Sequence, residues 1–401
     1  MTPIKIAVIS DLHIGEGVYA KDLCPYSDSA KKINSSDFIG TFASFISREK
    51  IEVDYLIVAG DISEKSRTDE VVKASEVLNN FMGILNVAKE KTFFTVGNHD
   101  NSWDDPDSRP SYSAFTDSNN IFKEIDNNSS HSLFKTPFYT YWENDEIIVF
   151  SYNSAHQDHQ GTTPHKGCIP QAAIKGLDNL FEEKAASSKY KIFVVHHHLL
   201  QYSNPIPDEP DFSIMVNAQN LIDLLTKHNF DLVIHGHKHC PKMRLASTEY
   251  HYSLPTISAG SFSKILDTRW NGYVNNQFHV IEIHGKERTS TYGVMKSWAL
   301  LAGDGWIPSN SHHGIHHEVP FKPFDYLETK NKIINAITLT LEHKTTVTWK
   351  EVVEIQKDLI YLRRELLEKV LNDIDRERKF IVHPSPKDSP ETIIFILREE
   401  K

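Results

Sequence analysis

The chain has 401 residues, and its 43 lysines and arginines against 54 aspartates and glutamates give it a formal net charge of −11. This acidic balance excludes a strongly basic nucleic-acid-binding protein. Hydrophobic residues make up 39% of the sequence and charged residues 24%, which is typical of a folded globular protein and excludes a disordered chain. The length allows one large domain with an appendage, or two to three smaller domains.

The cysteines and the N-terminal segment indicate a cytoplasmic protein. Cys24, Cys168 and Cys240 are widely spaced and odd in number, so they predict neither a disulfide framework nor a paired-cysteine metal site. The opening segment, MTPIKIAVIS, lacks the basic start and the cleavage site of a signal peptide. No segment approaches the roughly 20 consecutive apolar residues that cross a bilayer, so we expect no membrane contact.

Up to Cys240, short apolar runs alternate with helical patterns. The apolar runs predict strands at residues 4–9, 54–59, 92–96, 191–195 and 231–234. Apolar residues at spacings of three and four predict helices at residues 36–50, 68–89 and 217–228. This alternation is typical of βαβ units with parallel strands. Polar residues follow several strands directly, at the positions where open α/β sheets bind ligands.

Two further segments complete the predicted main domain, residues 1–300. Residues 101–135 are polar and aperiodic, which indicates an inserted loop or a small cap beside the strand ends. After Cys240, short strand-like runs without helices indicate an antiparallel second sheet packed on the first. We therefore expect an α/β fold, a layered αββα sandwich of two mixed β-sheets flanked by helices, with a helical C-terminal extension.

The rest of the chain is expected to lie outside this sandwich. Residues 301–325 contain glycine, proline and histidine and are predicted to form a linker or surface loop. Residues 326–401 are predicted to form an α+β extension with an amphipathic helix at 348–376, roughly 40 Å long. Its apolar stripe either packs on its own domain or forms a homodimer or protein-partner surface. Acidic and basic residues alternate on its other faces, which favours solvent exposure over a nucleic-acid groove.

Five polar segments carry the chemistry, and each follows a strand-like run. They are Asp11-Leu12-His13, Gly60-Asp61, Gly97-Asn98-His99-Asp100, His196 and Gly236-His237-Lys238-His239. Carboxylate, amide and imidazole groups that meet at strand ends form a donor set for divalent transition metals, and this set is large enough for two ions. A carboxylate can bridge two ions about 3.5 to 4 Å apart, which is the geometry that activates water for attack on a phosphoryl group.

This ordered set resembles the motifs of the calcineurin-like metallophosphoesterase superfamily over about residues 4–240. The resemblance implies two divalent metal ions as cofactors (Mn²⁺, Fe²⁺ with Fe³⁺ as an alternative, or Zn²⁺). It implies one ion on Asp11, His13 and His239, a second on Asn98, His196 and His237, and Asp61 as the bridge between the two. It also implies that His99 is the acid near the leaving group and that Asp100 orients His99.

Details of the motifs separate the branches of the superfamily. Protein serine/threonine phosphatases have GDxxDRG and GNHE, whereas this chain has GDISEKS and GNHD. Purple acid phosphatases have a tyrosine ligand three residues after the second-motif aspartate, where this chain has Glu64. The GNHD, VVHHH and GHKH segments resemble the cyclic-nucleotide phosphodiesterase branch. The resemblance therefore implies hydrolysis of a cyclic nucleotide, or of another small nucleotide diester, by a metal-bridging hydroxide.

Two alternative functions stay open. One is a DNA or RNA nuclease resembling the SbcD type, which shares the GNHD motif and would have nucleic acid as its partner. The net charge of −11 argues mildly against it without excluding a local positive patch. The other is a phosphatase subunit that depends on a protein partner bound through the C-terminal helix.

Several other side chains are weaker candidates. Arg109, in the insertion, and His198, after the strand at 191–195, are candidates for substrate contacts. The histidines of the polar segment after residue 155 either line the site or lie on the surface; they are His156, His159 and His165. A last group forms either a further metal site or, as its spacing favours, a solvated loop; it comprises His312, His313, His316 and His317.

Overall fold

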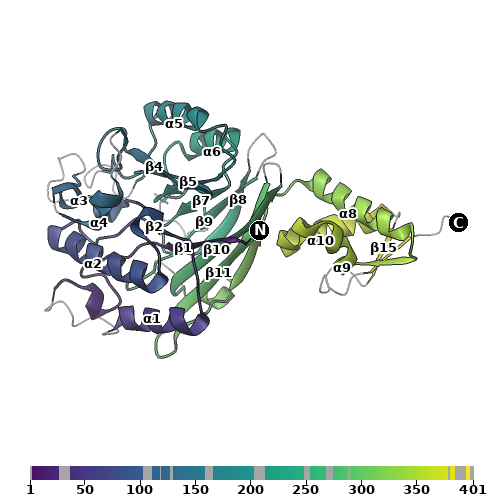
Figure 1. Ribbon diagram of the computed structural model, residues 1–401, viewed down its shortest axis with the longest axis horizontal. Helices are drawn as coiled ribbons and strands as arrows, with labels where there is room; N and C mark the ends of the chain where they lie inside the picture. Colours follow the sequence, from purple (N-terminus) through teal and green to yellow (C-terminus); the bar gives the residue numbers. More distant parts are fainter. Residues whose placement is uncertain are drawn as a thin grey trace.

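Two β-sheets lie face to face in the main part of the molecule, and helices cover their outer faces (Figure 1). The computed structural model describes residues 2–26, 37–102, 111–117, 119–126, 130–158, 166–202, 213–247, 253–267, 274–287, 290–377, 380–383 and 394–397. Within these ranges, none of the helices combines the length and the apolar character that a membrane crossing requires.

The first sheet contains seven strands in the order β12-β11-β10-β1-β2-β3, with β13 paired to β11. Its parallel part consists of β1 (Ile4–Ile9), β2 (Tyr55–Ala59) and β3 (Thr92–Thr95). Its antiparallel part consists of β10 (Asn276–Glu287), β11 (Ser290–Leu301), β12 (Gly305–Pro308) and β13 (Glu318–Phe321). The register pairs Ile4 with Ile283, so these later strands add directly to the N-terminal strand.

The second sheet contains six strands in the order β4-β5-β6-β7-β9-β8. They are β4 (Tyr139–Glu143), β5 (Ile147–Tyr152), β6 (Tyr190–Val195), β7 (Leu232–His235), β8 (Lys242–Ser247) and β9 (Ser253–Ser258). The four central strands are parallel, and the two edge strands are antiparallel to their neighbours. The predicted fold class, an αββα sandwich of two mixed sheets, is confirmed.

The expectation that the strands after Cys240 form an antiparallel sheet of their own is wrong. Strands β8 and β9 extend the second sheet beside β7, whereas β10 to β13 extend the first sheet beside β1. Each parallel sheet has an open edge whose backbone N–H and C=O groups need partners. The late strands therefore divide between the two edges.

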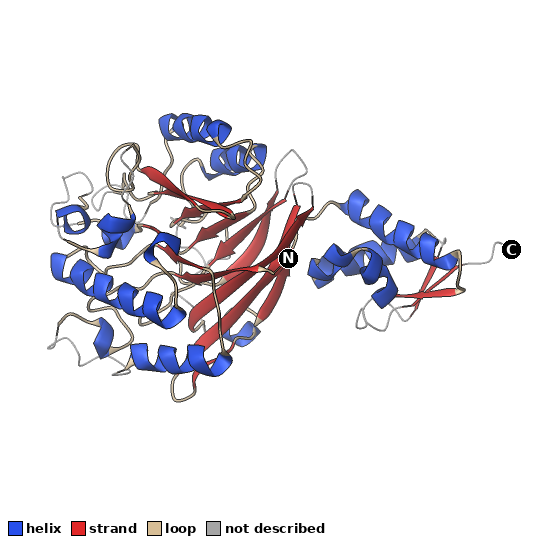
Figure 2. Ribbon diagram, viewed as in Figure 1, coloured by secondary structure: helices blue, strands red, loops and turns tan. Residues whose placement is uncertain are grey.

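Three apolar layers stabilise the sandwich. The middle layer lies between the sheets and includes the buried side chains of Val8, Ile57 and Ile257. One outer layer packs α1 (Phe38–Glu49) and α2 (Thr68–Leu85) on the first sheet, and the other packs α5 (Gln171–Glu183) and α6 (Ala218–Lys227) on the second (Figure 2). Short 3₁₀ turns connect some of these elements, namely η1 (Lys21–Leu23) and η3 (Lys89–Lys91).

The described part of the predicted insertion at 101–135 includes two short helices. It contains α3 (Ser113–Asp117) and α4 (Ile121–Ile125). Phe115 and Phe122 of these helices join the outer layer of the first sheet, where the ring of Phe122 lies 5.4 Å from that of Phe94. This segment therefore packs as part of the sandwich.

The predicted linker at 301–325 instead contributes two strands to the first sheet. It contains β12, the 3₁₀ turn η5 (Ser311–His313) and β13. Trp306 explains the difference, because its buried ring packs against Phe42, Phe45 and Phe262 with ring centroids 5.4 to 5.9 Å away. A short strand anchored by one tryptophan has no periodic pattern in the sequence that would predict it.

A smaller domain with its own apolar core follows β13. It contains α8 (Tyr326–Leu341), β14 (Thr346–Thr348), α9 (Trp349–Ile355), the 3₁₀ turn η6 (Lys357–Tyr361), α10 (Arg364–Arg376), β15 (Phe380–His383) and β16 (Ile394–Leu397). Its antiparallel sheet has the order β14-β16-β15. This order of helices and strands is that of a winged helix, with α9 and α10 joined by residues 356–363, which include η6.

The predicted continuous helix at 348–376 is wrong, because η6 separates α9 from α10. Asp358 in η6 is buried and hydrogen-bonded to Lys322 and Lys332, and Leu359 enters the apolar core beside it. A folded-back chain lets both halves of the apolar stripe share one core, which a single straight helix could not do. Tyr361 packs against His284 with ring centroids 5.1 Å apart, and this contact joins the domain to the first sheet.

Candidate metal centre

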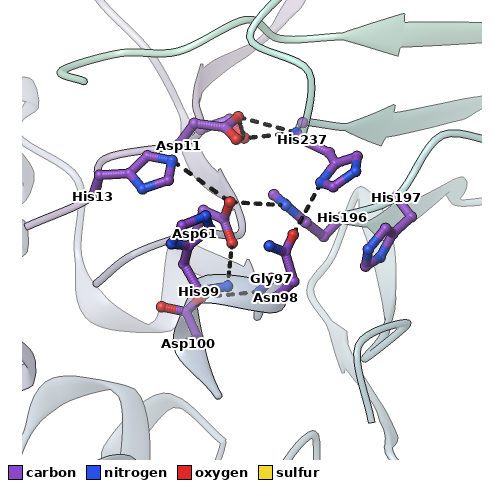
Figure 3. Close-up of polar contacts among 12 residues, drawn as sticks. Asp11, His13, Asp61, Gly97, Asn98, His99, Asp100, His196, His197 and His237 are labelled. Atoms are coloured by element: carbon purple, nitrogen blue, oxygen red, sulfur yellow. Dashed lines mark hydrogen bonds and ion pairs between the residues drawn. The ribbon is translucent and has the colours of Figure 1, made fainter. Parts of the chain in front are cut away.

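The five polar segments meet at one edge of the sandwich, where strands of both sheets end. Asp11 and His13 follow β1, Asp61 follows β2, and the 3₁₀ turn η4 (Asn98–Asp100) follows β3. His196 follows β6 of the second sheet, and His237 and His239 follow β7. Figure 3 shows the labelled side chains gathered around Asp61. The parallel strands of a sheet end on the same side, and this shared direction brings the segments together.

Five of the gathered residues have a left-handed backbone conformation. The φ angles are 52°, 51°, 49°, 85° and 55° for Asp11, His13, Asp61, His237 and His239. Non-glycine residues in strained backbone conformations cost roughly 1–3 kcal/mol each and persist only where the surroundings hold them. Backbone hydrogen bonds provide part of this hold, since the N–H of Asp11 donates to Gly60 O at 2.9 Å and that of His13 donates to Asp61 O at 3.0 Å.

One group of side chains contains Asp11, His13, Asp61 and His239, whose ligand atoms all lie within 4.8 Å of one another. The Nε2 atoms of His13 and His239 are 3.2 Å apart. His239 Nε2 is 3.3 Å from Asp11 Oδ1, and His13 Nε2 is 3.6 Å from Asp61 Oδ2. Two imidazole nitrogens and two carboxylates therefore converge on one small volume.

A second group contains Asp61, His196 and His237, also with ligand atoms within 4.8 Å of one another. His196 Nε2 is 3.2 Å from Asp61 Oδ2, and Asn98 Oδ1 is 2.9 Å from His237 Nδ1. The fold thus brings together all seven residues that the motifs single out as ligands. They form two groups that share the carboxylate of Asp61.

The carboxylates and imidazoles compensate one another's charge in this buried site. Burial alone would raise the pKa of Asp61, but the imidazoles of His196 and His99 hold it well below its ordinary value. Burial alone would lower the pKa of His196, but Asp61 raises it to about 9. Burial lowers the pKa of His13 to about 3, which keeps its imidazole neutral and its nitrogen available as a ligand.

This donor set fits a pair of divalent cations. Carboxylate and imidazole donors suit Mn²⁺, Fe²⁺ and Zn²⁺. The Nε2 atoms of His13 and His239, which face each other at 3.2 Å, can share at most one proton in a hydrogen bond. A cation between them would accept both lone pairs and would also neutralise the nearby carboxylates.

Glycine residues, which have no side chain, allow the ligand segments to approach one another closely. A Cβ atom at Gly97 would lie 2.1 Å from Asp61 Oδ1, and one at Gly236 would lie 2.0 Å from Ser10 Oγ. These two glycines therefore provide space. Gly60, with a φ of 91°, is the one motif glycine before a ligand that provides a left-handed turn.

His99 lies beside the first group, but the structure does not support the expected role of Asp100 in orienting it. The N–H of His99 donates to Asp61 Oδ1 at 2.9 Å, and its ring Nδ1 lies 2.9 Å from Glu64 O. The buried carboxylate of Asp100 accepts instead from backbone N–H groups at 2.8 to 3.1 Å, those of Ile62, Ser63 and Gly97. A buried carboxylate needs several donors, and these loops supply them. Asp100 therefore joins the second motif to the third.

The second and third of the three consecutive histidines after β6 contact neighbouring side chains. The ring Nδ1 of His197 lies 2.7 Å from Ser154 Oγ. His198 is completely buried, and its ring packs against those of Tyr202 and His235. This position does not support the expectation that His198 contacts the substrate.

The remaining predicted candidates lie away from the two groups or outside the described residues. Arg109, His159 and His165 belong to the latter. His156 is half-buried against Phe138, with ring centroids 4.7 Å apart. The histidines at 312, 313, 316 and 317 form no metal-type group among the residues that the structure describes.

Two further side chains at the site belong to none of the predicted ligand or catalytic motifs. Glu64 Oε2 is 2.8 Å from His13 Nδ1, and Lys264 Nζ is 3.3 Å from the same nitrogen. The sequence marks Glu64 only as the residue that replaces a tyrosine ligand. No local pattern connects Lys264, which follows β9, with a histidine near the N-terminus, so only the fold reveals it.

Gly97→Ala tests the close approach of the motifs. The added methyl group would displace Asp61 from its shared position, so we expect the variant to bind fewer or weaker Mn²⁺ ions than the parent protein while keeping its fold. Isothermal titration calorimetry measures the binding, and circular dichroism checks the fold. Gly83→Ala in α2 is the matched control, because a Cβ there would have nothing within 4 Å. Unchanged Mn²⁺ binding by Gly97→Ala would contradict the geometry described above.

A family model of calcineurin-like phosphoesterases matches residues 4–241, whereas no curated protein matches the chain. Among solved structures, a dimetal phosphatase from Danio rerio is 12% identical with a TM-score of 0.47, and the match covers 80% of this chain and 99% of that one. Vacuolar Protein Sorting 29 from Cryptosporidium parvum is 12% identical with a TM-score of 0.34, with coverages of 81% and 100%.

A purple acid phosphatase from yellow lupin (Lupinus luteus) is 13% identical with a TM-score of 0.45, and the match covers 76% of this chain and 52% of that one. This chain therefore spans about half the length of the lupin enzyme. The family model, by contrast, covers more than half of this chain and includes all five polar segments. The chain belongs to the calcineurin-like phosphoesterase family.

Proposed function

We propose that this protein is a phosphodiesterase that uses two divalent metal ions to hydrolyse a small nucleotide diester, with cyclic nucleotides as the first candidates. The observation that carries the proposal is the pair of ligand groups that share Asp61. Two metal ions in such groups, when bound, supply an activated water and neutralise the charge of a phosphoryl group.

Each group has a distinct set of proposed ligands. Asp11, His13 and His239 would hold one ion, and Asn98, His196 and His237 would hold the other, with Asp61 in contact with both. Mn²⁺, Fe²⁺ or Fe³⁺, and Zn²⁺ all accept such donors. The left-handed turns fix these side chains before any ion binds, so little reorganisation is needed on binding.

His99 is the proposed acid that protonates the leaving oxygen. Its Nδ1 must donate to Glu64 O, because a carbonyl oxygen can only accept a hydrogen bond. Nε2 is then the ring nitrogen that can hold the proton for the substrate. The backbone N–H of His99 donates to Asp61 Oδ1, which places this ring next to the shared carboxylate.

The preference for diesters rests on the motifs. GNHD, VVHHH and GHKH resemble those of cyclic-nucleotide phosphodiesterases. A nucleotide diester releases a strongly basic alkoxide, and departure of such a group benefits from proton donation by a residue such as His99.

A nuclease is the second candidate, because the winged-helix arrangement of the C-terminal domain favours a nucleic-acid partner. In helix-turn-helix proteins, the second helix enters the DNA major groove, and α10 holds the corresponding place in this order of elements. The charges of α10 disfavour DNA binding, so the nuclease is the second candidate. Arg364 pairs with Glu368 at 2.8 Å and Arg363 pairs with Glu365 at 3.7 Å, so acidic groups accompany the basic ones.

Asp61→Asn tests the proposed shared ligand. We expect hydrolysis of bis(p-nitrophenyl) phosphate in Mn²⁺ to fall by more than about 10²-fold, since loss of one electrostatic group at a reacting centre already costs that much. The bound Mn²⁺, measured by atomic emission, should fall as well. Asp178→Asn is the matched control, because Asp178 also belongs to an Asp-Glu-His group but is paired with Lys227 on the helical face.

The same protein, assayed on a panel of substrates, separates the candidate functions. Cyclic nucleotides and bis(p-nitrophenyl) phosphate should be cleaved faster than p-nitrophenyl phosphate. Faster cleavage of the monoester would contradict the diester preference. Cleavage of DNA or RNA that weakens steeply with added salt would support the nuclease instead.

His99→Gln tests the acid. A general acid contributes about 10² to 10⁴ in rate when the leaving group is poor. We expect a loss of this size for a diester with an alkoxide leaving group and a much smaller loss for one with p-nitrophenolate, which departs without a proton. Equal losses on both substrates, measured as kcat/KM, would contradict proton donation by His99.

A further inference from the structure

We infer that Glu64 is a positioning residue that fixes the ring orientations of both His13 and His99. It thereby connects a metal ligand to the acid. The inference rests on the proposed function for the roles of these two histidines. Four contacts define the position of Glu64. They involve its side chain, its carbonyl oxygen, its N–H and the ammonium group of Lys264.

The side chain of Glu64 determines which nitrogen of His13 faces the ligand group. Glu64 Oε2 lies 2.8 Å from His13 Nδ1. Since a carboxylate only accepts hydrogen bonds, His13 Nδ1 carries the proton, and Nε2 presents its lone pair toward Asp61. A carboxylate behind a ligating histidine also raises the basicity of the ligand nitrogen.

The main chain of the same residue holds the second histidine. Glu64 O lies 2.9 Å from His99 Nδ1, and the rings of His13 and His99 meet edge to face with centroids 4.5 Å apart. A substitution of Glu64 removes the contact with His13 but leaves its carbonyl oxygen in place. The two histidines should therefore respond differently to the same substitution.

The surroundings keep Glu64 in this position. Its N–H donates to Ile14 O at 3.1 Å, which fastens the segment after β2 to the segment after β1. A Cβ at Gly17 would lie 2.5 Å from Glu64 Oε2, so the carboxylate occupies space that a side chain would fill. Lys264 Nζ lies 3.9 Å from Glu64 Oε2 and provides a compensating charge.

The alternative role for Glu64 is direct metal ligation. Glu64, His13 and His99 also form a group whose potential ligand atoms lie within 4.8 Å of one another. If Glu64 were itself a ligand, an amide would replace it poorly. If it positions His13, the amide oxygen of glutamine can still accept the hydrogen bond from Nδ1. Glu64→Gln and Glu64→Ala therefore separate the two roles.

Mn²⁺ titration of the full-length variants tests the inference. Glu64→Ala should weaken one of the two Mn²⁺ sites by about 10- to 100-fold, the usual effect of losing a residue behind a metal ligand, and Glu64→Gln should restore most of that affinity. Glu16→Gln, which removes an exposed partner of Lys65, is the control and should bind as the parent does. Equal losses in Glu64→Gln and Glu64→Ala would overturn the positioning role in favour of direct ligation.

Nitrogen NMR of labelled histidines gives a readout that needs neither activity nor metal. His13, assigned with His13→Gln, should carry its proton on Nδ1 in the parent and in Glu64→Gln, and should lose this preference in Glu64→Ala. His99 should keep its Nδ1 proton in all three proteins. A His13 proton on Nε2 in the parent would refute the inference even if a variant failed to fold. Retention of both ions by Asp61→Asn would instead refute the proposed function.

Discussion

The site depends on one carboxylate, that of Asp61, which lies between imidazoles from two different sheets. Asp61 follows β2 of the first sheet, and His196 and His237 follow strands of the second sheet. The face-to-face packing of the sheets therefore decides whether the two ligand groups meet. Strands β8 to β13 complete both sheets, so residues that contribute no ligand still determine the geometry at Asp61.

Holding that carboxylate requires backbone conformations that are unfavourable on their own. The compensation comes from outside the motifs. Ser261 Oγ donates to Asp11 O at 2.8 Å, and Ser263 Oγ donates to Leu12 O at 2.7 Å, both from the segment after β9. Asp100 accepts from the turn after β2 in the same way. A hydrogen-bonded frame thus maintains the left-handed turns around the ligands.

Much of the sandwich and the identity of the gathered residues could be predicted from the sequence, because strands and motif segments are local patterns. The sequence does not predict which sheet the late strands join. The pairing of β9 with β7 and of β10 with β1 depends on which sheet edge stays open. The sequence does not predict the break at η6, because the apolar residues of both halves of the 348–376 segment have helical spacing. Glu64 and Lys264 meet His13 only through long-range folding, so no spacing in the sequence marks them.

The proposed function requires two metal ions, one in each of the two groups on either side of Asp61. Anomalous diffraction from crystals grown with Mn²⁺, recorded at the manganese absorption edge, tests it most directly. We expect two peaks about 3.5 to 4 Å apart, both in contact with the Asp61 carboxylate. A single peak, or peaks that lie away from Asp61, would contradict it.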